Sequence, residues 1–497
     1  MVATIDNQYG AIVIGSGPGG YAAAIKLGLL GIKTLCIEKE PVLGGVCLNW
    51  GCIPSKALIS ATKLKSHVED AKAFGLQSDG LFFDIEKLKD WKDGIVKKMN
   101  SGVAALIKNS GGRFITQGTA TVLDANSVRV TRLGGEAETY SASKGIIIAT
   151  GASPIILPGF EPDGRSVITS KEAIHFKDIP KHLLILGGGV IGIELSSVYQ
   201  RLGSKVTIVE ISDRILPGTD PDLAKVVEGK LRRNSVEIRT RTRALGCEKA
   251  GSSLGVTLQG SDGQCTMEVD RVLVAVGFRP NSQGLGLEEL GVRFDAKGHI
   301  AVDLKYQTSV PHIYAIGDVA CEPYLAHKAT KEAEIAAEVI AGKKSERSWE
   351  ALPAAIFSDP EIATVGLNEQ EARLQGYSVT IGKFPFVASG RALAIAETEG
   401  FIKVLVDSKN DRILGVGIVG PEASELIAEV ALGMEMGAVG EDVALTIHTH
   451  PTLSEGLMEA FKQALGEAIN IANPRRLYGA AMRPDSLAES SKALHQQ

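Results

Sequence analysis

The sequence predicts an α/β protein that contains the same strand–helix–strand unit twice. The first copy is AIVIGSGPGGYAAAIKLGLLGIKTLCIEKE (11–40), and the second is LLILGGGVIGIELSSVYQRLGSKVTIVEIS (183–212). Each copy runs from an apolar segment through G-x-G-x-x-G into a helical pattern, and then into a second apolar segment that ends in glutamate. In both copies the first glycine precedes that glutamate by 23 positions. A repeated unit of this kind predicts two Rossmann-like dinucleotide-binding domains.

The glycines share one task, which is to keep side chains out of a turn that binds a dinucleotide. The first glycine of each motif permits the tight turn, the second lets the backbone approach a pyrophosphate, and the third lets the helix pack closely on the strand. They are Gly15, Gly17 and Gly20 in the first copy and Gly187, Gly189 and Gly192 in the second. The helix N-terminus adds free N–H groups and the positive end of the helix dipole. Leu-Gly pairs (30–31 and 202–203) suit the two helix C-termini. Two such sites imply two cofactors.

A glutamate ends each copy, Glu38 in the first and Glu210 in the second. Each stands where a carboxylate can accept hydrogen bonds from ribose hydroxyls. Glu210 would repel a 2′-phosphate, so the second site favours NAD over NADP. Arg214, four residues on, leaves NADP open because NADP sites usually place an arginine nearby.

Composition and charge exclude several function classes. The chain has 497 residues, a formal net charge of −5 and no long basic run, which argues against nucleic-acid binding. The first ten residues lack the apolar region of a signal peptide, and the longest near-apolar run (183–193) is too short to span a membrane. Six cysteines are too few for a disulfide framework. We therefore expect a reducing compartment, the cytoplasm, or an organelle matrix if a transit peptide has been removed.

The stretch GGVCLNWGCIPSK (44–56) holds Cys47 and Cys52. The other cysteines are scattered, so the chain offers no zinc site of about four ligands. In a regular helix, Cα atoms five positions apart lie about 8–9 Å apart, whereas a disulfide tolerates roughly 7 Å at most. The segment therefore cannot be an ideal helix if the bond forms, and Gly51 eases the distortion. Pro54 suits the first turn of a helix, which would place Cys52 near a positive dipole end. A redox-active pair is favoured, and a structural or incidental pair stays open.

At this point the chain resembles the pyridine nucleotide–disulfide oxidoreductases, over roughly residues 9–473. Within that family it is most similar to the members that act on lipoamide. The resemblance is carried by long motifs in the family's order. These are GSGPGG (15–20), GGVCLNWGCIPSK (44–56), ATG (149–151), GGGVIGIE (187–194), AVGFRPN (275–281), IYAIGDVA (313–320), LAHKA (325–329) and HTHPTLSE (448–455).

The resemblance implies FAD in the first unit and NAD in the second. It places Asp318 on the flavin ribityl chain, and Tyr324, Leu325, Ala326 and His327 near the isoalloxazine. Lys56 would lie by the flavin and pair with Glu194, while Gly277 would approach NAD. Further FAD contacts are implied at Gly45, Val46, Gly118, Ala120, Thr150 and Gly151. Val46 replaces a frequent threonine, so only a backbone contact is carried over there. Trp50 replaces a residue that is often smaller, with no predicted direction of effect.

The implied activity is oxidation of protein-bound dihydrolipoamide. Cys47 would exchange with the substrate, and Cys52 would be the thiolate that faces the flavin. His450 would accept the substrate's proton, with Glu455 on its other ring nitrogen. His448 is expected to support the site and not to react. Hydride would pass finally to NAD.

The implied architecture adds a C-terminal α+β dimerisation domain to the two Rossmann-like domains. The expected boundaries are 1–155 for FAD, 156–283 for NAD, 284–353 for a segment that completes the FAD site, 354–474 for the dimerisation domain and 475–497 for a mobile tail. Residues 401–407 and 412–420 are expected to form a strand pair. The family pattern implies a homodimer in which His450 serves the partner's cysteines.

The implied partners are lipoyl-bearing proteins, namely the acyltransferase of a 2-oxoacid dehydrogenase complex or the lipoyl protein of glycine cleavage. Two alternatives stay open. The chain could reduce glutathione or another disulfide, although Glu210 argues against the NADP that such enzymes favour. It could also be a mainly structural subunit of such a complex, although the full set of catalytic residues argues against that. A mercuric-ion reductase should carry a further cysteine pair near its C-terminus, and no cysteine follows Cys321.

Overall fold

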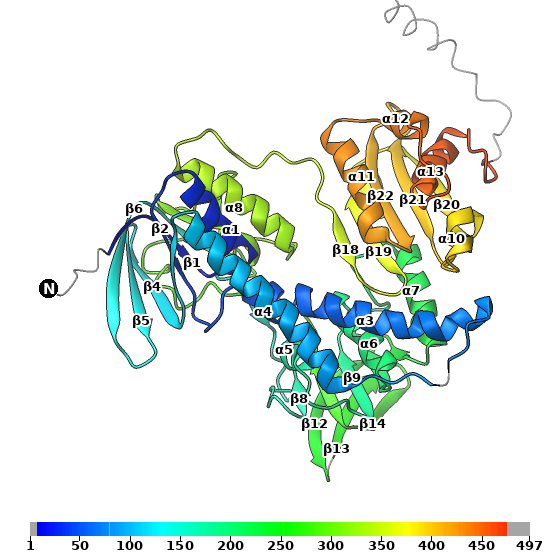
Figure 1. Ribbon diagram of the computed structural model, residues 1–497, viewed down its shortest axis with the longest axis horizontal. Coiled ribbons are helices and arrows are strands. Elements are labelled where there is room, and N and C mark those ends of the chain that lie inside the picture. Colours follow the sequence, from blue (N-terminus) through cyan, green and yellow to red (C-terminus); the bar gives the residue numbers. More distant parts are fainter. Residues whose placement is uncertain (1–6, 79, 252, 475–497) are drawn as a thin grey trace, which may run out of the picture. The chain divides into compact units, whose positions relative to one another are not determined.

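The computed structural model describes residues 7–78, 80–251 and 253–474, and the chain divides into two compact units between Ala363 and Thr364. Figure 1 shows its helices and strands. The tail (475–497) that we predicted to be mobile lies outside the described residues.

The first unit contains a seven-stranded sheet whose main path is β3-β2-β1-β6-β5-β4. β1 pairs in parallel with β2 and β6, and β17 pairs in parallel with β6, whereas β4, β5 and β6 form an antiparallel meander. The strands are β1 (Gln8–Ile14), β2 (Thr34–Ile37), β3 (Arg113–Ile115), β4 (Gly118–Asp124), β5 (Ser127–Arg132), β6 (Ala137–Ile148) and β17 (Ile313–Ala315).

Apolar side chains cover both faces of this sheet, as expected of strands that are buried on two sides. One core packs α1 (Pro18–Leu29), α4 (Ile85–Asn109) and α8 (Ala326–Ile340) on the parallel strands. α1 begins with a proline and is rich in alanine, so it forms a helix readily and approaches the sheet closely. The other face packs against the meander and residues 285–302.

A second Rossmann-like sheet follows, with five parallel strands in the order β11-β10-β9-β15-β8. Its elements are β8 (Val167–Ile168), α5 (Ser170–Ile174), β9 (His182–Leu186), α6 (Val190–Arg201), β10 (Lys205–Val209), α7 (Pro221–Arg233), β11 (Glu237–Arg239) and β15 (Arg271–Val274). An antiparallel meander lies between β11 and β15 in the chain: β12 (Arg243–Ala250), β13 (Ser253–Gly260) and β14 (Gly263–Val269). Two Rossmann-like units were predicted, and both are confirmed.

Two short connections tie these sheets into one unit. β7 (Ala152–Pro154) and β16 (Phe278–Pro280) pair where the chain enters and leaves the second sheet. The cysteine motif lies on α2 (Gly45–Trp50) and α3 (Cys52–Asp70), and α3 packs on α6. The remaining short helices of this unit are η1 (Ala71–Phe74) and η2 (Gly317–Val319).

The second unit is an antiparallel sheet with helices, which confirms the α+β prediction. β20 (Val379–Pro385), β21 (Phe401–Asp407) and β22 (Ile413–Gly420) form consecutive antiparallel pairs, including the strand pair predicted from the sequence. β18 (Ala354–Ile356) and β19 (Glu361–Gly366) precede these strands in the chain, β18 and the first half of β19 lying before the boundary at Ala363, and they belong to the same five-stranded sheet, in the order β18-β19-β22-β21-β20. The helices are α9 (Glu369–Leu374), η3 (Phe386–Ala388), α10 (Gly390–Ala394), α11 (Ala423–Glu435), α12 (Gly440–Leu445) and α13 (Glu455–Leu465).

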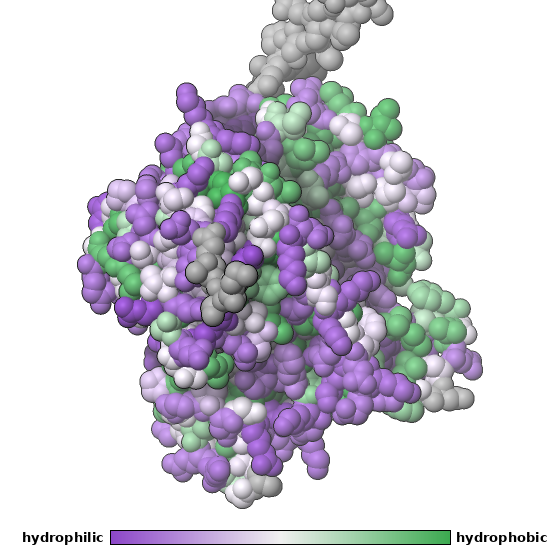
Figure 2. Space-filling model, turned by 60° about the vertical axis from the view of Figure 1, so that its left-hand side comes forward, coloured by the Kyte–Doolittle hydropathy of each residue, from purple (hydrophilic) through white to green (hydrophobic). Residues whose placement is uncertain are grey.

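Within the ranges that the structure describes, no helix has the length and apolar character that crossing a membrane requires. The face shown in Figure 2 carries hydrophilic side chains over most of its area, with smaller hydrophobic patches between them.

Candidate active site

The first and third glycines of both G-x-G-x-x-G motifs lie where a side chain cannot fit. Gly15 has φ +100°, and a Cβ there would lie 2.3 Å from the carbonyl oxygen of Ala149. Gly187 repeats this with φ +108° and 2.4 Å to the carbonyl oxygen of Ala275. A Cβ on Gly20 or Gly192 would lie 1.9 or 2.1 Å from the oxygen of the first glycine of its own motif. The turn and the helix packing therefore both require glycine.

The second glycine of each motif borders open space. A Cβ on Gly17 would approach nothing nearer than Gly45 Cα, at 4.0 Å, and one on Gly189 would have no neighbour within 4 Å among the described residues. These glycines are the N-caps of α1 and α6, and neither helix has a side-chain cap. The free N–H groups at the start of α1 and α6 thus face a space that stays open because Gly17 and Gly189 have no side chain. Both loops fit the pyrophosphate of a dinucleotide.

Glu38 and Glu210 make the same contacts in the two copies. Glu38 accepts hydrogen bonds from the Ser16 amide (2.9 Å), the Ser16 hydroxyl (2.6 Å) and the Glu40 amide (2.9 Å). Glu210 accepts from the amides of Gly188 (2.6 Å) and Ser212 (2.8 Å). Each buried carboxylate therefore fixes its glycine loop and keeps further lone pairs for ribose hydroxyls. The sequence predicted the ribose role but not this locking role, because backbone donors leave no signal in a residue pattern.

Arg214, the residue that kept NADP possible as the second cofactor, contacts its own loop. Its Nη2 donates to the Pro217 carbonyl at 3.0 Å, and its Nη1 lies 3.8 Å from a carboxylate oxygen of Asp213. The geometry at Glu210 therefore still favours NAD.

The cysteine motif is a helix that breaks between its two sulfurs. α2 ends at Trp50, Gly51 adopts φ −130° and ψ −118°, and α3 begins at Cys52. A Cβ on Gly51 would lie 2.9 Å from the Val46 carbonyl oxygen and 3.0 Å from Cys47 Cα, so the chain doubles back here against its own backbone. The prediction that this segment is not one regular helix is confirmed.

The two thiols are free in the structure and titrate as an asymmetric pair. The Cys47 thiol donates a hydrogen bond to Cys52, which raises the pKa of Cys47 and lowers that of Cys52. Burial also raises the pKa of Cys47, while the Lys56 ammonium helps to lower that of Cys52. Cys52 is the first residue of α3, where the helix dipole also favours a thiolate. In the reduced pair, these contacts favour the thiolate at Cys52 and the proton at Cys47.

Lys56 is held by a buried carboxylate on α6. Its Nζ lies 2.8 and 3.0 Å from the two carboxylate oxygens of Glu194, whose side chain is 5% exposed. Glu194 also accepts the Phe357 amide at 2.9 Å, and the Lys56 ammonium lies 4.5 Å from the centre of the Phe357 ring. Because several contacts satisfy this partly buried ion pair, the ammonium keeps a fixed position one turn beyond Cys52.

Asp318 is a carboxyl group that needs a partner. Burial raises its pKa to about 6, and among the described residues no donor forms a hydrogen bond with it. The N-terminus of α8 follows in the chain and begins at the N-cap Leu325, again without a side-chain cap. A partly buried carboxyl group with no hydrogen-bond donor among the described residues, next to helix amides without a side-chain cap, fits the hydroxyl and carbonyl groups of a flavin with its ribityl chain.

The other predicted cofactor residues lie at the ends of the strands in both copies. Gly118 donates its amide to the Glu38 carbonyl (3.0 Å), at the end of β2. The Thr150 hydroxyl donates to the Asn281 carbonyl (2.8 Å), and Gly277, with φ +123°, follows β15. Gly45 packs so closely that a Cβ there would lie 2.6 Å from Gly17 Cα. The structure places the remaining residues predicted to contact a cofactor as follows: Val46 on α2, Ala120 on β4, Gly151 before β7, and Ala326 and His327 on α8.

Trp50 has an unexpected partner. The Lys171 ammonium on α5 lies 4.3 Å from the centre of a Trp50 ring, within the range of a cation–π contact. The indole is therefore held against α5.

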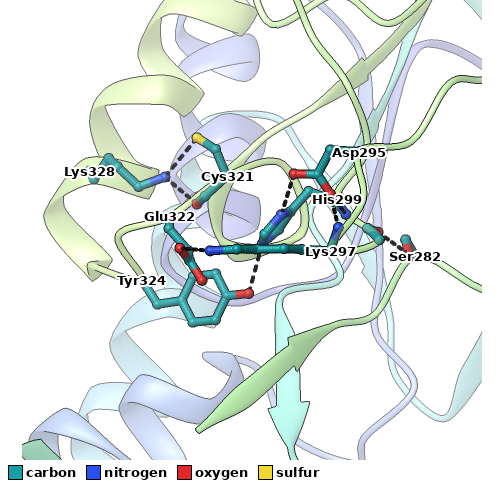
Figure 3. A network of polar contacts seen from close by, with 9 residues as sticks. Ser282, Asp295, Lys297, His299, Cys321, Glu322, Tyr324 and Lys328 are labelled. Atoms are coloured by element: carbon teal, nitrogen blue, oxygen red, sulfur yellow. Dashed lines mark hydrogen bonds and ion pairs between the residues drawn. The ribbon is translucent and has the colours of Figure 1, made fainter.

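Figure 3 shows polar contacts of the segment from Cys321 to Lys328, which follows Asp318 in the chain; the sequence analysis missed them. Lys328 on α8 donates to the Cys321 carbonyl oxygen at 2.9 Å and pairs with Glu332 at 2.9 Å. Glu332 accepts the Gly317 amide at 2.6 Å, and the side chains of Lys328 and Glu332 are 2% and 1% exposed. The four-residue spacing of Lys328 and Glu332 on a helix was the available signal.

The second unit carries the predicted base. His450 Nδ1 lies 2.9 Å from Glu455, which also accepts the Thr452 amide at 2.8 Å. Burial alone would raise the pKa of Glu455, but these two hydrogen bonds outweigh it and the pKa is lowered. A carboxylate at Nδ1 leaves Nε2 as the basic nitrogen, and the His450 side chain is 79% exposed.

His448 is different from His450, as the sequence predicted. Its side chain is 5% exposed, and both ring nitrogens have partners, the Thr446 carbonyl oxygen (2.9 Å) and a Glu429 carboxylate oxygen (2.8 Å).

The comparison with known proteins agrees with this geometry. Residues 9–333 match the pyridine nucleotide-disulphide oxidoreductase family, and residues 352–461 match the dimerisation domain of the same family. The chain belongs to this family. The dimerisation domain supports a homodimer, and the family and its relatives imply FAD and NAD(H) as cofactors.

Three relatives illustrate the similarity. A dihydrolipoyl dehydrogenase from Thermus scotoductus is 48% identical over 94% of this chain and 100% of its own length. One from Geobacillus stearothermophilus is 45% identical over 93% of this chain and 97% of its own length. Among solved structures, LpdA from Mycobacterium tuberculosis has a TM-score of 0.83 and 28% identity, covering 91% of this chain and 99% of that one.

Proposed function

We propose that this protein is a dihydrolipoyl dehydrogenase. It oxidises protein-bound dihydrolipoamide to lipoamide through the Cys47–Cys52 pair and delivers the electrons, by way of FAD, to NAD⁺. The observation that carries the proposal is the asymmetric thiol pair at the broken helix, with Lys56 and Glu194 beside it. The relatives, which share this activity in their names over nearly the whole chain, support it.

The residues that would hold the cofactors fall into two sets. Residues 1–155 and 284–353 would hold FAD, through the loop of Gly15 to Gly20, Glu38 and Asp318. Residues 156–283 would hold NAD, through the loop of Gly187 to Gly192 and Glu210. When bound, FAD supplies the two-electron transfer between the dithiol and the nicotinamide.

The chain's own residues organise the thiol exchange. His450 Nε2 takes the proton from one substrate thiol, and the resulting thiolate attacks the Cys47 sulfur of the oxidised pair. The Cys47–Cys52 bond breaks, and Cys52 leaves as a thiolate that Lys56 and the start of α3 stabilise. The second substrate thiol then attacks the sulfur bonded to Cys47. This closes the lipoamide disulfide; Cys47 leaves and takes up the proton of that second thiol, while the first proton stays on His450 until it passes to solvent.

The implied partners are lipoyl-bearing proteins, either the acyltransferase of a 2-oxoacid dehydrogenase complex or the lipoyl protein of glycine cleavage. We place the protein in the cytoplasm, because its few scattered cysteines suit a reducing compartment.

The test is a side-by-side assay of the purified protein with NADH against lipoamide and glutathione disulfide. We expect lipoamide to be reduced and glutathione disulfide to be turned over at least about a hundredfold more slowly, because a poor fit at the reacting sulfur costs transition-state binding. Cys47→Ser should abolish lipoamide reduction. Faster turnover of glutathione disulfide than of lipoamide would instead identify a different disulfide reductase.

A further inference from the structure

The segment that carries Asp318 is tied down at several points before it enters α8. Gly317 donates to Glu332, and the Cys321 carbonyl accepts from Lys328. Glu322 pairs with Lys297 at 2.7 Å on the surface. The last tie is made by Tyr324, the residue directly before the α8 N-cap, and Figure 3 shows it reaching toward His299.

Tyr324 belongs to a chain of three side chains. Its hydroxyl lies 2.8 Å from His299 Nε2, and His299 Nδ1 lies 2.8 Å from an Asp295 carboxylate oxygen. His299 is 3% exposed, so the imidazole is buried between its two partners. The rings of His299 and Tyr324 meet edge to face, with centroids 5.9 Å apart.

The chemistry of the partners fixes the direction of these hydrogen bonds. The Asp295 carboxylate only accepts, so Nδ1 of the neutral ring carries the hydrogen and Nε2 accepts from the Tyr324 hydroxyl. Burial, with Glu322 nearby, raises the pKa of Tyr324 to about 12, so the phenol keeps its proton at neutral pH.

A tight turn positions Asp295 and His299. Asp295 accepts the amides of Lys297 and His299, both at 2.8 Å, and Gly298 takes φ +88°. Ser282 donates its hydroxyl to the Gly298 carbonyl at 2.6 Å (Figure 3). A turn fixed in this way holds the imidazole independently of α8.

Asp295, His299 and Tyr324 form a triad that lies near the Asp318 carboxyl group. His299 and Tyr324 both interact electrostatically with Asp318, so the three groups are neighbours. Tyr324 therefore lies in the chain between Asp318 and the N-terminus of α8, the two features that fit a flavin and its ribityl chain.

We propose that His299, oriented by Asp295, is a positioning residue for FAD: it holds the Tyr324 hydroxyl and so sets the spacing between Asp318 and the α8 N-terminus. The inference rests on the proposed function in that FAD is taken as the occupant. It deepens that function by assigning residues outside the family motifs to cofactor retention.

The test measures how fast FAD leaves the purified full-length protein, from the rise in free-flavin fluorescence after dilution. Tyr324→Phe removes one oxygen atom, and His299→Leu removes both hydrogen bonds of the imidazole. We expect each to speed release about three- to tenfold, the size expected of one buried hydrogen bond. Because they break the same contact, the double variant should release FAD no faster than His299→Leu alone.

Two comparisons separate positioning from general stability. His299→Gln keeps a polar side chain that can contact Tyr324, and it should restore slow release and the wild-type visible absorption band of bound FAD. Lys331→Met removes an exposed ion pair with Glu334 on α8 that is not one of the ties that hold the Asp318 segment, and it should leave release unchanged. If His299→Leu does not fold, the rate of FAD release from Tyr324→Phe decides the test.

Wild-type release rates in Tyr324→Phe, or effects that add in the double variant, would overturn the proposal while leaving the enzymatic function intact. A purified protein that binds no FAD at all would overturn both.

Discussion

Cys52 sits next to two groups that stabilise its thiolate, the Cys47 thiol and the Lys56 ammonium. Removing the ammonium in Lys56→Met should raise the pKa of Cys52, and the unpaired Glu194 left behind acts in the same direction. The measurement is the pH dependence of Cys52 alkylation by iodoacetamide in the reduced protein, with the labelled peptide identified by mass spectrometry. Lys63→Met, further along α3, is the matched control. An unchanged titration of Cys52 would contradict the assignment of Lys56.

Asp318 gives a prediction for the cofactor-free chain. Its pKa is raised from 3.8 to about 6 by burial, so the folded state favours the protonated form. The stability from this group is therefore fully present below its unfolded pKa and is lost as the pH rises through about 6. At neutral pH, Asp318→Asn should stabilise the FAD-free protein by about 1–3 kcal/mol, and near pH 4 it should have about no effect. Urea unfolding at the two pH values checks this. A gain of equal size at both would show that the charge is not responsible.

At this scale, the motif residues could be predicted from the sequence and their partners often could not. The spacing of each glutamate from its glycines indicated a ribose ligand. Glu38 accepts from the Ser16 amide and Glu210 from the Gly188 amide, and any residue can supply a backbone amide. His299 and Tyr324 lie 25 positions apart with no motif between them, so only the fold reveals their contact.

The break between α2 and α3 depends on Gly51. A Cβ at this position would press on the backbone of Val46 and Cys47, which cannot move aside as a flexible side chain would. Gly51→Ala should therefore destabilise the protein by about 1–3 kcal/mol and lower the fraction of the pair that is oxidised in a fixed thiol buffer. Gly94→Ala is the control, because Gly94 lies inside α4 with open space around its Cβ position. It should be neutral or stabilise by up to about 1 kcal/mol. Equal effects of the two would argue against a special backbone role for Gly51.

The duplicated βαβ unit allows a paired test of the two glutamates. Glu210→Gln should weaken NADH binding and narrow the preference over NADPH, since the side chain no longer repels a 2′-phosphate. Glu38→Gln makes the same change in the other copy and should affect FAD retention, leaving the NADH to NADPH ratio as in the wild type. The two dissociation constants for the reduced nucleotides report the result. A wild-type protein that binds both nucleotides equally would remove the basis for this role of Glu210.

Elements with a strong local signal matched their prediction. Both helices after the glycine loops end at the predicted Leu-Gly pairs, with φ of +76° at Gly31 and +103° at Gly203. The meander β12–β14 was not predicted: its middle strand β13 alternates between buried and less buried residues, but β12 and β14 carry many exposed and polar residues and show no clear alternation. It forms a separate three-stranded sheet between β11 and β15 in the chain, and a local pattern does not encode which strands pair.

For the whole molecule, the exposed His450 indicates where the base acts. The second unit also exposes large apolar side chains, which a homodimer can bury: Leu432 at 65%, Met436 at 78%, Leu445 at 73% and Ile447 at 96%. We expect each active site to combine the cysteines of one chain with His450 of the other.

Complementation tests this arrangement. Cys47→Ser and His450→Ala are each expected to be inactive, and they are unfolded and reassembled together in equal amounts. In a mixed dimer one site would receive both changes and the other neither, so random mixing should restore about a quarter of wild-type lipoamide turnover. Each variant reassembled alone is the control. Mixed dimers that bind FAD and remain inactive would place His450 at its own chain's cysteines.

The pairing of β17 with β6 has a consequence for how the chain is made. β6 ends at Ile148 and its partner β17 begins only at Ile313, with the whole second Rossmann-like sheet between them. At roughly 5–20 residues per second, a ribosome needs on the order of 10–30 seconds to reach β17. During that time the second sheet, which is continuous in sequence, can complete its folding, whereas Ile146, Ile147 and Ile148 keep an unpaired strand edge. The nascent chain is therefore most vulnerable to aggregation in this window, and premature termination before residue 313 would leave that edge uncovered permanently.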